Sequence, residues 1–112
     1  MTDKKIPFFF HGILQGRYED EPAELFGYEL FERGFNTFKR SEGKVVMGSL
    51  AYVPRGDVDE LDRIEGFPSY YVRIQKPVVL EDGTTVIAWV YQQAKDWMED
   101  SYKEMLDHAE TI

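Results

Sequence analysis

The apolar residues of this chain come in short runs of β-branched and aromatic side chains, separated by isolated glycines and prolines. Such runs are typical of strands, and none approaches the roughly 20 apolar residues that cross a bilayer as a helix. A turn is expected at Ser41–Gly43, and Asp82-Gly83 is a favoured hairpin turn. The expected strands cover Phe8–Phe10, Gly27–Phe35, Val45–Val53, Tyr70–Leu80 and Thr84–Tyr91.

Two segments have helical signals instead. Asp57 is a good N-cap with Glu60 three residues later, which predicts a capping box, while Gly66 and Pro68 favour an early stop. A second helix is expected from Lys95 to about Ala109, with an acidic side facing solvent or forming the outer surface of a dimer. About six strands and two helices indicate an α+β domain on a mostly antiparallel sheet or small barrel. The apolar positions of the second helix are Trp97, Tyr102, Met105 and Leu106.

Composition narrows the class of protein further. A chain of 112 residues, 43% of them hydrophobic, is expected to form one domain over residues 1–112. Its net charge of −8 argues against nucleic-acid partners and against a cationic membrane-binding helix. The absence of cysteine excludes disulfides, thiolate catalysis and zinc–thiolate sites. The first residues lack a secretory apolar region, so a cytoplasmic location is expected.

Glu65 is the clearest candidate for a catalytic residue. It lies seven residues after Val58 and four after Leu61, on the inward stripe of the first expected helix. Burial and the negative end of the helix both raise the pKa of a carboxyl group there, towards the range that suits a general base. The alternative is that the helix frays early and Glu65 faces solvent or pairs with Arg73.

A second candidate segment follows the first strand. His11-Gly12-Ile13-Leu14, with Gly16 close behind, is a glycine-containing loop whose backbone N–H groups could bind a carboxylate or an oxyanion. A lone histidine at a strand end is more often structural than catalytic. The two histidines, His11 and His108, are nearly a whole chain apart and have no metal-ligand spacing.

These two segments resemble the gamma-glutamylcyclotransferase-like superfamily, most closely its short gamma-glutamylamine cyclotransferase branch. The pattern Leu-Asp-x-x-Glu-Gly-x-Pro-x-x-Tyr-x-Arg occurs whole from Leu61 to Arg73, with Tyr71 as its tyrosine. Members open with a Tyr-Gly-Thr/Ser-Leu loop, and here His11 and Ile13 replace its tyrosine and its threonine or serine.

The resemblance implies a small mixed, mostly antiparallel β-barrel with two flanking helices and one cavity at its mouth. It implies an enzyme that needs no cofactor or metal and takes a small gamma-glutamyl substrate. The α-amine of the glutamyl group attacks its own γ-carbonyl, which forms 5-oxoproline and releases an amine. Glu65 would be general base and acid, and the substrate would be held by His11, Gly12, Ile13, Leu14, Tyr71 and Arg73.

A different class of function stays open at this stage. Ile13 cannot donate the side-chain hydrogen bond that a threonine or serine would. A non-catalytic member of the family could bind a small amine conjugate or a protein partner in the same cavity. An enzyme needs both Glu65 inside a pocket and free N–H groups of the loop lining that pocket, whereas a binding module is expected to have a filled cavity and an exposed apolar patch.

Overall fold

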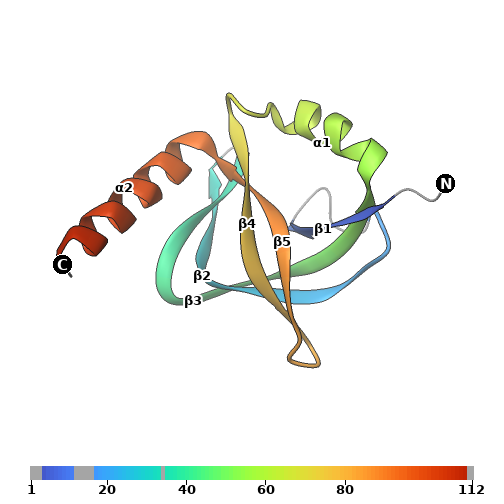
Figure 1. Ribbon diagram of the computed structural model, residues 1–112, viewed down its shortest axis with the longest axis horizontal. Helices are drawn as coiled ribbons and strands as arrows, with labels where there is room; N and C mark the ends of the chain where they lie inside the picture. The colour runs from blue at the N-terminus through green and yellow to red at the C-terminus, as the bar shows by residue number, and fades with distance from the viewer. Residues whose placement is uncertain (1–3, 12–16, 34, 111–112) are drawn as a thin grey trace.

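Five strands close into a barrel in the computed structural model, which describes residues 4–11, 17–33 and 35–110 (Figure 1). The strands run around it in the order β1-β3-β2-β4-β5, and β1 closes the barrel by pairing in parallel with β5. The other neighbouring pairs are antiparallel, which confirms the expected mixed barrel. The strands are β1 (Lys5–Phe10), β2 (Asp20–Arg33), β3 (Phe35–Pro54), β4 (Tyr71–Leu80) and β5 (Thr85–Gln93).

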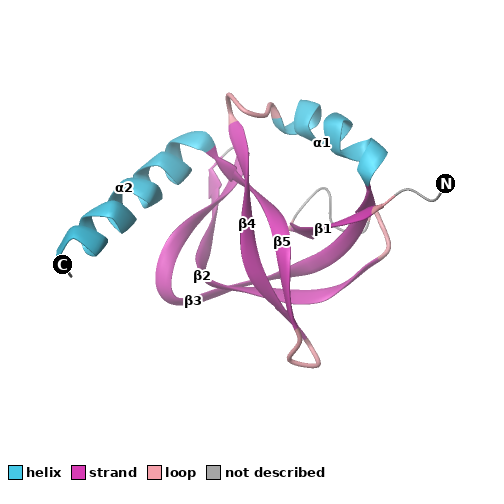
Figure 2. Cartoon of the chain, viewed as in Figure 1, coloured by secondary structure: helices cyan, strands magenta, loops and turns pink. Residues whose placement is uncertain are grey.

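Two α-helices flank the barrel, as expected (Figure 2). A short 3₁₀ turn, Arg55–Asp57, leads from β3 into α1 (Val58–Glu65), which connects β3 to β4. The longer α2 (Ala94–Glu110) follows β5 directly and extends away from the barrel. Within the described ranges, neither helix combines the length and apolarity needed to cross a membrane.

The aromatic run of β1 is buried on both of its faces. Phe9 belongs to the main core cluster inside the barrel, together with Leu25 and Leu50. Phe8 and Phe10 point the other way, into a second cluster that contains Leu61 of α1. A strand covered on both sides needs a continuous apolar run, which explains why the sequence does not alternate here.

Gly48 lets β3 pack closely against β1. A Cβ at this position would lie 2.5 Å from the carbonyl oxygen of Phe10 and 2.7 Å from Cζ of Phe9. Real Cβ atoms do not approach other atoms so closely, so a larger residue would push the two strands apart.

The expected turn at Ser41–Gly43 is wrong. Strand β3 continues through it, and the ladder with β2 passes from the pair Phe26–Val45 to the pair Tyr28–Arg40 across a bulge. A glycine with positive φ serves a bulge as well as a turn, and Gly43 has φ 81°. The chain instead reverses between Arg33 and Phe35, at the end of a stretch expected to be one strand. The described residues form five strands, where about six were expected.

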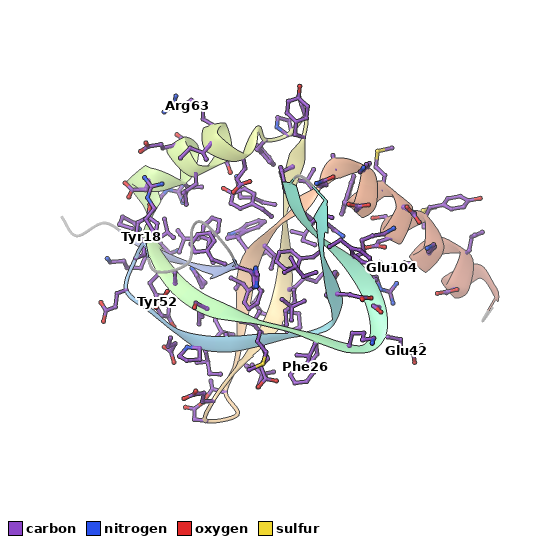
Figure 3. The ribbon with its side chains drawn as sticks, turned by 180° about the vertical axis from the view of Figure 1, so that it is seen from behind. Tyr18, Phe26, Glu42, Tyr52, Arg63 and Glu104 are labelled. Atoms are coloured by element: carbon purple, nitrogen blue, oxygen red, sulfur yellow. The ribbon has the colours of Figure 1, made fainter. Side chains whose placement is uncertain are left out.

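Helix α2 is present where expected, but its orientation is the reverse of the prediction. Two of its carboxylates face the barrel, where Asp96 is 4% and Asp100 6% exposed. Glu104 lies on the same side and pairs with Arg40 at 3.2 Å (Figure 3). The acidic side is therefore an attachment surface rather than a solvated one. The large apolar side chains that are exposed instead are Trp97, Met98, Tyr102, Met105 and Leu106.

Asp100 joins α2 to the bulged part of β3. Its Oδ2 accepts hydrogen bonds from the backbone N–H of Arg40, at 3.0 Å, and from Nε2 of Gln92, at 2.8 Å. Asp96 accepts a further bond of 2.8 Å from the hydroxyl of Thr37. Periodicity identifies the two sides of a helix, but these buried donors at the barrel rim decide which side faces inward.

Replacing Asp100 with alanine should lower the free energy of unfolding by about 2 kcal/mol, because the buried donors of Arg40 and Gln92 lose their acceptor. Urea denaturation measures this change. Asp107→Ala, at an exposed position of the same helix, is the matched control and should change stability by less than about 0.5 kcal/mol. Equal losses in both variants would contradict the assigned role of Asp100.

Candidate functional site

Helix α1 places Glu65 at its last helical position, half-buried. Leu61, one turn earlier, is fully buried against the second core cluster and fixes which side of the helix faces inward. Gly66 ends the helix in the left-handed conformation, with φ 73° and ψ 36°. The expected stripe and helix stop are therefore confirmed, and the early-fraying alternative is not what the structure has.

The expected capping box at the start of α1 is wrong. Asp57 occupies the N-cap position, but its backbone is helical, with φ −89° and ψ −11°, and its side chain makes no capping hydrogen bond. Its carboxylate instead accepts a hydrogen bond of 3.1 Å from the hydroxyl of Tyr18. The preceding 3₁₀ turn causes the difference, because a capping side chain requires an extended backbone at the N-cap.

Glu65 makes no hydrogen bond or ion pair with any residue in the described ranges. Burial raises the pKa of its carboxyl group above the ordinary glutamate value. The carboxylate also lies at the C-terminal end of α1, where the helix dipole disfavours negative charge. A carboxyl group whose pKa is raised takes up a proton more readily than an ordinary glutamate does.

Asp62, one turn before Glu65, is the centre of a network that the sequence analysis did not single out. Arg73 donates to Asp62 from Nε at 2.7 Å and from Nη2 at 3.1 Å, and the hydroxyl of Tyr91 donates to it at 2.6 Å. The Arg73 guanidinium also stacks over the rings of Phe67 and Trp89, 4.9 Å from each centroid. This network ties the last turn of α1 to β4 and β5.

The network answers one open question about Glu65. Arg73 pairs with Asp62 and not with Glu65, so the cation that could have neutralised Glu65 is already engaged. The sequence already indicated a second possible partner for Arg73, because Asp62 lies three residues before Glu65 on the same helix. The contribution of Arg73 to substrate binding stays a prediction.

Tyr71 and Glu65 line the same cavity. Tyr71 begins β4 opposite Gln93 of β5, and the side chains of Tyr71 and Gln93 hydrogen-bond. Burial, together with the nearby negative charge of Glu65, raises the pKa of the Tyr71 phenol. The cavity has a volume of about 600 Å³, and Gln93 is a lining residue that sequence reasoning missed. Its lining consists of Arg63, Ile64, Glu65, Gly66, Tyr70, Tyr71 and Gln93.

The loop after β1 is described only at its first residue. His11 is half-buried, and its Nδ1 is buried with no hydrogen-bond partner in the described part of the chain. Gly12, Ile13 and Leu14 lie outside the described residues, so the expected set of backbone donors stays a prediction. Across the described ranges, no group of three or more histidine, aspartate or glutamate side chains could hold a metal ion.

The sequence matches a known family model over most of its length. Residues 8–109 match the model described as "Gamma-glutamyl cyclotransferase, AIG2-like". None of the curated proteins is similar enough in sequence to count as a relative.

Solved structures with the same fold are distant in sequence. The barrel is similar to a protein of Arabidopsis thaliana solved in solution, with a TM-score of 0.73 and 18% identity over 99% of this chain and 84% of that one. It is similar to a structure named gamma-glutamyl cyclotransferase, with a TM-score of 0.68 and 18% identity over 80% and 67% of the two chains. A mouse AIG2-like protein gives a TM-score of 0.65 and 21% identity over 81% and 78%.

Replacing Asp62 with alanine should lower the free energy of unfolding by about 2–3 kcal/mol, because Arg73 and Tyr91 lose their shared partner in a partly buried site. Asp59→Ala, at an exposed position of α1, is the matched control and should be nearly neutral. If chemical denaturation gives the same stability for both variants, the network does not hold α1 on the barrel.

Proposed function

Because the chain belongs to the gamma-glutamyl cyclotransferase, AIG2-like family, we propose that it converts a gamma-glutamyl amine into 5-oxoproline and a free amine. One observation carries the proposal for this chain. A half-buried glutamate without a partner in the described residues lines an open cavity, and burial raises its pKa. This is the state that a group needs when it must first accept a proton and then return it.

Glu65 serves as the proton carrier in the proposed reaction. Its carboxylate takes a proton from the α-ammonium of the glutamyl group, and the freed nitrogen forms a bond to the γ-carbonyl carbon. The bond from that carbon to the amide nitrogen then breaks, and Glu65 returns the proton to the departing nitrogen. Of the three ammonium protons, one stays on the lactam nitrogen and one reaches the departing nitrogen through Glu65. The third is lost to water, from which the released amine takes up a proton to become its ammonium, so Glu65 ends as it began.

Holding the glutamyl group in reactive geometry supplies much of the remaining rate enhancement, because the nucleophile and the electrophile belong to one molecule. Asp62 and Arg73 fix the turn of α1 that carries Glu65, and Tyr71 and Gln93 form the neighbouring wall. We assign the α-carboxylate and the developing oxyanion to the backbone of residues 12–14, on the family resemblance. His11 stands at the start of this loop as a further substrate contact.

The open cavity favours catalysis over the alternative, a binding module that uses the same cavity, whereas the exposed apolar side of α2 is a feature that such a module is also expected to have. The space beside Glu65 is open, at about 600 Å³, where a module that has lost its reaction would be expected to fill it. A half-buried carboxylate without a partner in the described residues is also destabilising when it is ionised.

The Glu65→Gln variant tests the assignment. Release of 5-oxoproline is measured with a panel of gamma-glutamyl amines and gamma-glutamyl amino acids. We expect kcat to fall by about 10²–10⁴, because the amide cannot carry a proton. Glu60→Gln, on the exposed side of the same helix, is the control and should retain activity. Equal activity in wild type and Glu65→Gln would remove Glu65 from the mechanism, and no product from wild type would favour the binding module.

Glu65→Gln should lower activity, but it should raise stability at pH 7. Because the pKa of Glu65 is raised in the folded state, the folded protein holds its proton to higher pH than the unfolded chain does. Ionisation of Glu65 therefore lowers the free energy of unfolding as pH rises from the unfolded pKa through the folded one. Glu65→Gln should unfold at higher urea concentration than wild type at pH 7, and the difference should shrink on acidification. A variant less stable than wild type at pH 7 would contradict this.

A further inference from the structure

The outward side of α2 has five large apolar side chains that are exposed. Each large apolar side chain of this surface is between 41% and 70% exposed. The opposite side makes the contacts with the barrel, through Asp96 and Asp100. A helix attached by its polar side leaves its apolar side for another surface. We call this set of residues the α2 face: Trp97, Met98, Tyr102, Met105 and Leu106.

The distribution of charge permits a second copy of this chain on the α2 face. The protein has a net charge of −8, so two copies repel each other at most orientations. The helical period places Asp96, Asp100 and Asp107 on the side opposite Met98 and Met105. The centre of the α2 face therefore has no carboxylate, and two copies can meet there without placing acidic groups together.

The α2 face is also symmetric about its own midpoint. Met98 and Met105 lie equally far from the point between Ser101 and Tyr102, and so do Trp97 and Leu106. A two-fold axis at that point would set Met98 of one copy against Met105 of the other, with the helices antiparallel. A surface that matches itself in this way suits an isologous dimer.

The available area lies near the lower limit for such a dimer. From the exposed fractions, the five side chains offer on the order of 500–600 Å² per copy. Two copies would bury roughly 1,100 Å² from these side chains alone, near the lower limit of about 1,200 Å² for specific interfaces. Lys95 and Glu99 on the margin of the face, and Tyr70 at its N-terminal end, would add to this area.

We propose that the protein forms a homodimer in which the α2 helices of two copies pack antiparallel through the α2 face. The interface begins close to the cavity, since Gln93 immediately precedes α2 and the carbonyl of Tyr70 accepts a hydrogen bond from the N–H of Ala94. The second copy therefore lies beside the cavity mouth, and each cavity uses the Glu65 of its own chain. The dimer does not depend on the proposed reaction.

Sedimentation velocity tests the dimer directly. Wild type should sediment as a dimer at tens of micromolar, and Met98→Asp with Met105→Asp should sediment as a folded monomer, with the dissociation constant raised at least 100-fold. Met47→Asp is the matched control, because Met47 is 71% exposed on β3 and outside the α2 face. A monomeric wild type would overturn the proposal, as would dimers that survive the double substitution or that Met47→Asp disrupts.

Single cysteines test the antiparallel arrangement, because the natural chain has none. Cysteine at Tyr102, next to the two-fold axis, should form an intermolecular disulfide under mild oxidation at least tenfold faster than cysteine at Met98. In the proposed dimer, the two copies of residue 98 are offset by about 10 Å along the helices, beyond the Cα separation of roughly 7 Å that a disulfide spans. Equal rates, or faster cross-linking at residue 98, would overturn the antiparallel arrangement.

Discussion

The bidentate ion pair between Asp62 and Arg73 is the interaction on which the geometry of the site depends. It joins a helix of eight residues to the barrel at the turn that carries Glu65, and the Tyr91 hydroxyl and the rings of Phe67 and Trp89 hold it in place. A helix this short has little stability of its own, so the position of its last residue is set by its tertiary contacts. With Arg73 engaged by Asp62, Glu65 is left without a cation in the described residues.

This separation of roles gives two carboxylates of one helix opposite properties. Asp62 is paired and structural, whereas Glu65, three residues later, is desolvated with a raised pKa. Burial without a partner lowers stability when Glu65 is ionised, and in the proposed reaction the same raised pKa suits the carboxyl to carry a proton. The membership of the chain in the gamma-glutamyl cyclotransferase, AIG2-like family and the chemistry of this one residue point to the same proposed reaction.

The sequence predicts the parts of the fold that depend on residues close together in the chain. The buried aromatic run of β1, the turn at Gly83 and the helix stop at Gly66 were all readable, and so was the placement of Glu65 relative to Leu61. The bulge at Gly43 was mistaken for a turn, because both use positive φ. The inward side of α2 depends on donors of β3, which are distant in sequence, and on Gln92 of β5, which is eight residues from Asp100, and no periodicity contains that information.

The central claim is that desolvation of Glu65 sets the ionisation on which the reaction depends. The most direct measurement is the pKa of its side-chain carboxyl, followed by carbon-13 NMR and compared with the acidic limb of the pH dependence of kcat/KM for 5-oxoproline release. We expect both to give one pKa, above that of an ordinary glutamate. An ordinary pKa for Glu65, or an acidic limb that does not coincide with its titration, would contradict the account.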